Sequence, residues 1–305
     1  MEIRWNDTPR KTWDTALRHA AWPQGWAYGA ALAAQGRPVH RAAIVEDGET
    51  VGYAQFTGRR FLGRLHVSTC NRGPVWPGAV PDAVRRQAYR ALRETIPLPW
   101  PRGVFITPDA DDAEGEALRG ARFRQVMSPY STAILDLTAP DDTLLRAMQG
   151  KWRNRLRRAE AAAIKITVTA ARPGGYDGLL AEEAAQQRTR RYRTMPPAMV
   201  PAWQARGSAK DGVVVATAMQ GGQRLGSMLF LVHGAGALYH FGHASAAGRA
   251  VNAHNLLLWR AVRALRRKGV EALDLGGLDT VENPGIARFK LGSGARVRTL
   301  CGTWC

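Results

Sequence analysis

Apolar and polar residues alternate along two similar stretches of the chain, and this period of two predicts β-strands. The strand-like runs are residues 41–45, 48–56 and 61–68 in the first stretch, and residues 213–219, 222–230 and 237–244 in the second. The middle run of each stretch has the pattern Gly-x-x-aliphatic-Gly-x-x-x-Phe, as GETVGYAQF from Gly48 and as GQRLGSMLF from Gly222. The shared pattern indicates an internal duplication.

The same elements follow each stretch in the same order. We expect helices at residues 81–95 and 252–268 and short closing strands at residues 103–107 and 272–275. An antiparallel meander followed by a helix and a further strand is the layout of N-acetyltransferase (GNAT) domains. We therefore predict a mixed α/β protein of two tandem GNAT-like domains, each a mixed, mostly antiparallel sheet flanked by helices. The predicted ranges are 1–138 for the first domain, 139–163 for a basic helical connection and 164–305 for the second domain.

Basic residues exceed acidic ones and gather in clusters. The chain has 43 Lys and Arg against 25 Asp and Glu, which gives a formal charge of +18. One cluster lies in the predicted connection, at residues 151–158, and two others lie at residues 188–193 and 260–268. A single basic helix is often only a solvated surface. Three clusters in one chain favour a polyanionic partner, such as RNA or a nucleotide-linked substrate.

Several kinds of site lack their motifs. Coenzyme A-dependent enzymes of this layout bind the pyrophosphate on the N–H groups of a glycine-rich loop. At that place the second domain has Asn252 and His254 where glycines are required. The chain also lacks a Walker A motif, a GxGxxG fingerprint and any His/Cys/Asp/Glu grouping with metal-binding spacing. We therefore expect neither a metal nor a bound coenzyme.

We expect a cytoplasmic monomer, with peripheral contact to the inner membrane face left open. The longest near-apolar run, residues 225–232, is far shorter than the roughly 20 residues of a membrane span. The first residues lack the apolar centre of a signal peptide. Cys70, Cys301 and Cys305 have no CxxC spacing, which favours free thiols in a reducing compartment.

Four motifs occur in order along the chain: RGPVW from Arg72, KWRNRLRRA from Lys151, YHFGHAS from Tyr239 and DLGGLDTVENPGIARFK from Asp274. With these motifs, almost the whole chain resembles the FemABX family of aminoacyl-tRNA-dependent peptidyltransferases. The resemblance implies two acetyltransferase-like domains, in agreement with the duplication. It also implies transfer of an amino acid from a charged tRNA to an amine, typically on the peptide of a nucleotide- or lipid-linked murein precursor.

The resemblance assigns the reaction centre to the last of these motifs. Lys290 would act there, and Phe289, Asp274, Gly276 and Gly277 would line the substrate channel. Aminolysis of an aminoacyl ester needs a neutral amine, stabilisation of the developing oxyanion and a proton for the leaving ribose hydroxyl. A fixed ammonium such as that of Lys290 stabilises the oxyanion, and an ester is already activated, so the reaction needs neither ATP nor a metal. The competing interpretation of Lys290 is a surface lysine on a helix.

Other residues would bind the two substrates. Tyr239, Phe241 and Arg72 would contact the acceptor, although Phe241 suits the core equally and Arg72 also suits a turn. The residues expected to contact tRNA, or alternatively to form a plain domain linker, are Lys151, Arg153, Asn154, Arg155 and Arg158. The sequence departs from the family at Glu183 and Gln186, where many members have threonine and arginine. Arg190 and Tyr192, with Arg188, are the expected substitutes in acceptor binding.

Two other functions stay open at this point. One is a coenzyme A-dependent N-acyltransferase that acts on an envelope or natural-product amine. The other is an RNA-binding protein that keeps the acyltransferase scaffold without catalysis.

Overall fold

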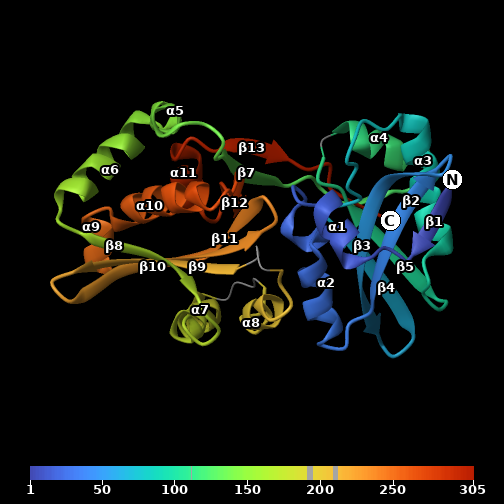
Figure 1. Cartoon of the computed structure of the whole chain (residues 1–305), viewed down its shortest axis with the longest axis horizontal. Coiled ribbons are helices and arrows are strands. Elements are labelled where there is room, and N and C mark those ends of the chain that lie inside the picture. Colours follow the sequence, from blue (N-terminus) through green and yellow to red (C-terminus); the bar gives the residue numbers. More distant parts are fainter. Residues whose placement is uncertain (111, 191–194, 209–211) are drawn as a thin grey trace. The chain divides into compact units, whose positions relative to one another are not determined.

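The computed structural model describes residues 1–110, 112–190, 195–208 and 212–305. Within these residues the strands form two seven-stranded sheets, and the chain divides into two compact units (Figure 1). The first unit comprises Met1–Ser131 and Arg298–Cys305, and the second comprises Thr132–Val297. None of the described helices has the length and apolar character needed to cross a bilayer.

The sheet of the first unit has strand order β1-β2-β3-β4-β5-β14-β6, with β4 and β5 parallel. Its strands are β1 (Glu2–Trp5), β2 (Val39–Glu46), β3 (Glu49–Phe61), β4 (Leu65–Asn71), β5 (Arg102–Thr107), β6 (Gln125–Met127) and β14 (Thr303–Trp304). Its helices are α1 (Arg10–Ala16), the 3-10 helix η1 (Trp22–Gln24), α2 (Trp26–Ala33), α3 (Asp82–Thr95) and α4 (Asp112–Gly120). On α3, the buried residues Ala88, Tyr89 and Leu92 share one helix face and pack into a core with Phe56 and Ile106 of the sheet.

The sheet of the second unit has strand order β13-β7-β12-β11-β10-β9-β8, with β11 and β12 parallel. Its strands are β7 (Ser131–Asp136), β8 (Lys165–Ala171), β9 (Gly212–Gln220), β10 (Gln223–His233), β11 (Gly236–Ala244), β12 (Ala272–Gly277) and β13 (Arg296–Thr299). Its helices are α5 (Asp141–Ala147), α6 (Gly150–Ala161), α7 (Asp177–Arg190), α8 (Met199–Gln204), α9 (Ala246–Ala250), α10 (Ala253–Arg267) and α11 (Pro284–Gly292). Helices α6 and α10 cover one face of this sheet, and α7 and α8 cover the other (Figure 1).

The repeated glycine pattern corresponds to a β-bulge in each unit. Ile44 pairs with Gly52 and Val45 with Thr50, so Val51 is the extra residue of the β2–β3 hairpin. In the β9–β10 hairpin Leu225 is the extra residue, because its two neighbours on β10 pair with consecutive residues of β9. The aliphatic-Gly step of the sequence pattern is therefore the bulge that bends both hairpins in the same way. The expected tandem GNAT-like α/β architecture is confirmed.

Each unit contains a strand that comes from the other half of the chain. β7 comes from the end of the predicted first domain but pairs with β12 of the second sheet. β14, near the C-terminus, lies between β5 and β6 of the first sheet. The compact units therefore differ from the predicted ranges 1–138 and 164–305. Local sequence predicts that a short segment is extended, but the sheet it joins depends on contacts distant in sequence.

Residues 139–163 do not form a separate connection. They fold into α5 and α6, which are separated by extended residues at Met148 and Gln149. Leu144 of α5 and Trp152, Leu156 and Ala159 of α6 are buried in the core of the second unit. The predicted basic helix exists as α6, and it belongs to that unit because its apolar face completes the core.

Candidate active site

The second sheet opens between its two parallel strands. In the described part of the chain, pairing between β11 and β12 is confined to Gly236–Leu238 and Ala272–Asp274. Beyond these residues β11 continues with β10 as far as Ala244, and β12 turns toward β7, where Gly277 pairs with Thr132. The equivalent strands of the first unit, β4 and β5, pair along their whole length from His66 to Asn71. Among the described residues, the separation of the two parallel strands is thus a property of the second unit.

The end of β12 is held in a turn by Asp274. One carboxylate oxygen, Oδ1, accepts hydrogen bonds from the Thr132 hydroxyl (2.6 Å) and from the backbone N–H of Gly276 (2.7 Å). Gly276 has φ = 79°, in the left-handed region that favours glycine. A Cβ atom there would lie 3.6 Å from Lys290 Nζ, an ordinary contact. The backbone conformation, rather than lack of space, explains this glycine.

Lys290 points back to this turn from α11. Its Nζ donates a hydrogen bond of 2.7 Å to the carbonyl oxygen of Gly277, and the residue is 8% exposed. Burial lowers the pKa of the Lys290 ammonium, and the negative charge of Asp274 opposes this shift. The structure thus brings together four residues that the sequence assigned to one site: Asp274, Gly276, Gly277 and Lys290.

Phe289 packs beneath this site. Its ring contacts the rings of Trp152 and His254, with centroid distances of 6.0 and 6.1 Å, and its carbonyl oxygen accepts a hydrogen bond from Trp152 Nε1 (3.0 Å). The Phe289 side chain therefore anchors α11 to α6 and α10, which holds Lys290 in place. Its expected contact with substrate stays a prediction.

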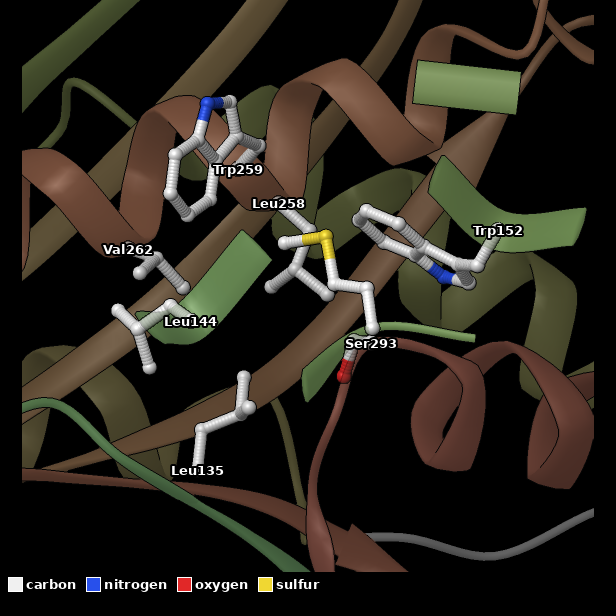
Figure 2. Close-up of a pocket in the computed structure, with 8 residues that line it drawn as sticks. Leu135, Leu144, Trp152, Leu258, Trp259, Val262 and Ser293 are labelled. Atoms are coloured by element: carbon white, nitrogen blue, oxygen red, sulfur yellow. The ribbon is translucent and has the colours of Figure 1, made fainter. Parts of the chain in front are cut away.

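A small apolar cavity lies beside Trp152. Residues of α5, α6, α10 and β7 surround it, among them Leu144, Trp152 and Val262 (Figure 2). The cavity holds about 10 Å³, close to the space for one water molecule, and apolar side chains form most of its wall. Ser293 contributes the polar atom, but its hydroxyl donates to the carbonyl oxygen of Lys290 (2.6 Å). This cavity is part of the packing and is too small for a substrate.

Tyr239 and Phe241 lie on the part of β11 that runs beyond β12. Tyr239 is half-buried and packs against Phe230, at 5.7 Å between ring centroids. A Cβ atom at Gly242 would lie 2.4 Å from the Tyr239 hydroxyl oxygen, so this glycine leaves room for the tyrosine along the strand. Phe241 is 7% exposed, as expected for a core residue. Their expected contacts with the acceptor stay predictions.

A buried polar cluster, missed as a unit by sequence reasoning, joins β11 to α7. His243 Nε2 lies 3.3 Å from an oxygen of Glu183, and His243 Nδ1 lies 2.9 Å from Gln186 Oε1. Glu183 is 3% exposed and accepts a further hydrogen bond from Gln187. The sequence singled out Glu183 and Gln186 only as departures from the family. Their i,i+3 spacing places both on one helix face, which was the available signal for a shared partner.

His240 lies next to this cluster. It is the extra residue of a bulge, because its neighbours Tyr239 and Phe241 pair with consecutive residues of β10. Burial lowers the pKa of His240 to about 4, although the charge of Glu183 opposes the shift. His240 is therefore neutral at physiological pH.

The remaining expected acceptor residues lie elsewhere or outside the described residues. Arg72 belongs to the first unit, where its Nε lies 2.8 Å from Asp109 Oδ1 and its own residue is 8% exposed. Its φ of 61° and its backbone bond to Thr107 place it in a turn after β4. Arg190 is the last residue of α7, and Tyr192 lies outside the described residues. Their roles stay predictions.

The expected tRNA-binding residues lie on α6. Lys151, Asn154, Arg155 and Arg158 are exposed, on the side of the helix opposite its buried residues. Arg153 is half-buried, and its guanidinium donates to the carbonyl oxygen of Leu145 (3.3 Å). The outer surface of the helix therefore presents three of these basic residues together with Asn154, and Arg153 partly serves to join α6 to α5.

Comparison with known proteins gives a consistent answer about the fold. Residues 146–291 match the family described as acetyltransferase (GNAT) domain. The crystal structure of FemX superposes with a TM-score of 0.81 at 15% identity, covering 100% of this chain and 96% of that chain. The chain has the FemX fold. The expected FemABX-like fold is thus confirmed, and the domain match supports an enzyme of the acyltransferase type.

Two further structures superpose on this chain with lower scores. The C-terminal domain of a putative lysylphosphatidylglycerol synthetase from Agrobacterium fabrum has a TM-score of 0.56 at 15% identity, covering 97% of this chain and 90% of that chain. A tandem GNAT protein from the clavulanic acid biosynthesis pathway has a TM-score of 0.52 at 15% identity, covering 99% and 98%. No curated protein matches the sequence at a significant level.

Proposed function

We propose that this protein transfers an aminoacyl group from a charged tRNA to the amine of an acceptor, in the opening between β11 and β12. The observation that carries the proposal is the buried Lys290 ammonium at the Gly277 end of this opening. The FemX fold supports the same reaction class. Because charged tRNA is the donor, we place the reaction in the cytoplasm.

The reaction follows from the chemistry of an aminoacyl ester. The acceptor amine attacks the ester carbonyl, and the carbonyl oxygen becomes negative as the C–N bond forms. Lys290 carries three N–H donors, of which one binds Gly277. Another donor is available to the oxyanion in a site with little water, where such an interaction is strong. Collapse of the intermediate then breaks the ester bond, and the ribose hydroxyl leaves with a proton.

The attacking amine must be neutral when it reacts. His243 is not placed to take its proton, because His243 Nδ1 faces Gln186 Oε1 at 2.9 Å and His243 Nε2 faces a Glu183 oxygen at 3.3 Å.

The coenzyme A alternative is disfavoured by the segment before α10. In GNAT enzymes this place offers backbone N–H groups to the pyrophosphate. Here Gly248 N–H donates to the Ser245 hydroxyl (3.0 Å), and the N–H groups of Arg249, Val251 and Asn252 donate to carbonyl oxygens within the segment. His254 follows, and its Nε2 lies 2.8 Å from the carbonyl oxygen of His243. These four N–H groups are engaged inside the protein, which supports a donor other than coenzyme A.

A titration distinguishes these two functions. Acetyl-CoA should show no site of micromolar affinity, which corresponds to about −8 kcal/mol, in calorimetry. A micromolar site would favour the coenzyme A-dependent reaction instead.

The proposed acceptor is an amine on a murein precursor, which is the acceptor that the FemABX resemblance implies. One of the similar structures is named for lysylphosphatidylglycerol synthesis, so a phospholipid with a headgroup hydroxyl, such as phosphatidylglycerol, is the second acceptor class to test. The decisive experiment incubates the protein with tRNAs charged with labelled amino acids and with nucleotide-linked precursor, lipid-linked precursor or phosphatidylglycerol. We expect label in a murein precursor only when charged tRNA is present. Label transfer from acetyl-CoA without tRNA would overturn the proposal.

A further inference from the structure

Large apolar side chains are exposed together at one end of the first unit's sheet. Phe61 and Leu65 flank the turn between β3 and β4 and are 48% and 41% exposed, and Leu62 in the turn is fully exposed. Trp100, shortly before β5, is 84% exposed. Single exposed apolar residues are common on protein surfaces, but a group of four this large needs an explanation.

The strand register shows that these four residues share one end of the sheet. Phe61 pairs with Leu65 across the β3–β4 turn. β4 and β5 are parallel, and His66, directly after Leu65, pairs with Arg102 and donates its N–H to the carbonyl oxygen of Pro101 (3.0 Å). Trp100 precedes Pro101 and therefore lies at the same end as the turn.

The turn also extends beyond the rest of the sheet. The last residue of β3 that pairs with β2 is Thr57, whereas pairing with β4 continues to Phe61. β5 accompanies β4 as far as His66, so the turn and its flanking pair Phe61 and Leu65 are the part that extends beyond the neighbouring strands. Leu62 adopts φ = 48° and Gly63 φ = 69°. The Arg64 N–H donates to the carbonyl oxygen of Phe61 (3.1 Å), so these positive φ values belong to the tight turn that closes the hairpin. The turn places the Leu62 side chain fully in solvent.

Arginines surround this apolar tip. Arg59, Arg60 and Arg64 are exposed on the hairpin itself, and Arg37, whose Nε donates to the carbonyl oxygen of Gly58 (3.2 Å), lies beside it. Glu94 near the end of α3 adds one negative charge, because the segment from α3 to β5 leads to the same end of the sheet. The tip is thus apolar at its point and basic around it.

We propose that the β3–β4 hairpin and Trp100 bind the surface of a membrane that contains anionic phospholipids. The apolar tip would enter the boundary between headgroups and acyl chains, where tryptophan is favoured. The arginines would lie at the level of the phosphate groups. The binding does not depend on the proposed function, but it would place an aminoacyltransferase next to a lipid-linked acceptor.

A bilayer fits this surface better than the other two candidates. RNA phosphates would satisfy the arginines but would leave Leu62, Phe61 and Leu65 in water. A stable protein partner would need about 800 Å² of complementary surface on each side, whereas the apolar part here consists of four side chains at one end of the sheet. A membrane accepts a small apolar wedge with a basic rim, because the two contributions add.

The test measures sedimentation of the protein with vesicles of phosphatidylcholine alone and of phosphatidylcholine mixed with an equal amount of phosphatidylglycerol. We expect binding to the mixed vesicles that weakens with salt, and little binding to the neutral ones. Leu62→Ser with Trp100→Ser should reduce binding by on the order of tenfold, and Arg60→Glu with Arg64→Glu should do so as well. The matched apolar control is Val126→Ser with Met127→Ser on β6, which are 48% and 64% exposed in the parent. It should bind like the parent.

All the substituted residues are exposed, so the variants should fold, and circular dichroism checks that they do. Each binding result therefore supports or contradicts the proposed membrane contact. Failure of the parent to bind mixed vesicles would overturn the proposal, as would equal binding of the parent and both hairpin variants. Loss of tRNA affinity in the hairpin variants with vesicle binding intact would assign the hairpin to RNA instead. Transfer from charged tRNA in solution is a separate readout, so a failure here leaves the proposed function standing.

Discussion

Lys290 is only 8% exposed, and this burial lowers the pKa of its ammonium group. A group whose folded-state pKa lies below its unfolded value opposes folding at every pH where the unfolded group is protonated, which includes neutral pH. Lys290 therefore does not owe its position to stability. Residues that disfavour folding in this way are typical of functional sites.

The first prediction follows from this position. Lys290→Met should lower single-turnover aminoacyl transfer by about 10²- to 10³-fold, because an oxyanion-stabilising donor is removed. The free energy of unfolding should stay the same or rise by up to about 1 kcal/mol, since no buried charge remains and water can reach Gly277. Urea unfolding and transfer kinetics measure the two effects. Lys165→Met on β8, where the lysine is exposed, is the control and should change neither. A near-normal transfer rate in Lys290→Met would remove this residue from the mechanism.

His240 gives the second prediction, on stability and pH. Burial lowers its pKa from 6.5 to about 4, so between these values the unfolded chain binds a proton that the folded protein does not. Stability that is present above pH 6.5 should be lost as the pH falls toward 4, by at most about 3 kcal/mol from this residue. Urea unfolding of the parent and of His240→Gln at intervals across this range should show a flatter dependence in the variant. The exposed His19, replaced by Gln, is the control. Parallel curves for the parent and His240→Gln would contradict the buried, neutral state.

Among the elements, α6 combines an anchoring face with an exposed basic one. Trp152, Leu156 and Ala159 are buried, and Trp152 also bonds to α11 through the carbonyl oxygen of Phe289. The helix that we expect to meet tRNA is therefore packed directly against the helix that carries Lys290. Binding of the donor and position of the reaction centre depend on the same packing.

The third prediction concerns the exposed face of α6. If Arg155 and Arg158 bind tRNA phosphates, Arg155→Glu with Arg158→Glu should lower tRNA affinity for all tRNAs alike. The slope of log K against log salt should become shallower, by about 0.7 to 0.9 for each phosphate that the variant no longer neutralises. Filter binding from low to moderate salt measures both. The hairpin reversal Arg60→Glu with Arg64→Glu carries the same charge change and should leave the slope as in the parent. An unchanged slope in the α6 variant would reduce α6 to a solvated structural helix.

Sequence reasoning succeeded for elements whose pattern is local. The β9–β10 and β2–β3 hairpins, α10 and the strand that ends at Gly277 appear close to their expected bounds, because period and turn residues specify each of them. The clustering of Asp274 with Lys290 followed from the family motif. The interaction of Glu183 with His243 did not, because it joins α7 to β11 across about 60 residues of intervening chain. The exchange of β7 and β14 was missed for the same reason.

For the whole molecule, this exchange makes the two units depend on each other's half of the chain. Trp304 of β14 is 3% exposed, pairs with Ile106 and packs in the core of the first unit. The C-terminal residues therefore contribute to a unit that begins at Met1.

The fourth prediction tests this dependence. Trp304→Ala should destabilise the first unit by about 3 to 5 kcal/mol, the usual cost of removing a buried tryptophan. Hydrogen exchange should then show the loss of protection in β4, β5 and α3, with protection in β10 and α10 retained. Trp100→Ala, which removes a tryptophan that is 84% exposed, should have little effect on either unit. Equal loss of protection in both units would mean that they unfold as one cooperative body.

The exchanged strand also has a consequence for synthesis on the ribosome. Until residues 303–304 have been made, β5 and β6 have no β14 between them, and the nascent first unit carries an unpaired strand edge next to an incomplete core. Such edges recruit other extended chains. We expect the isolated residues 1–131, produced as a separate polypeptide, to bind chaperones or aggregate, and the added segment 298–305 to improve their solubility. Residues 303–304, which are made long after β5 and β6, thus close the sheet of the first unit.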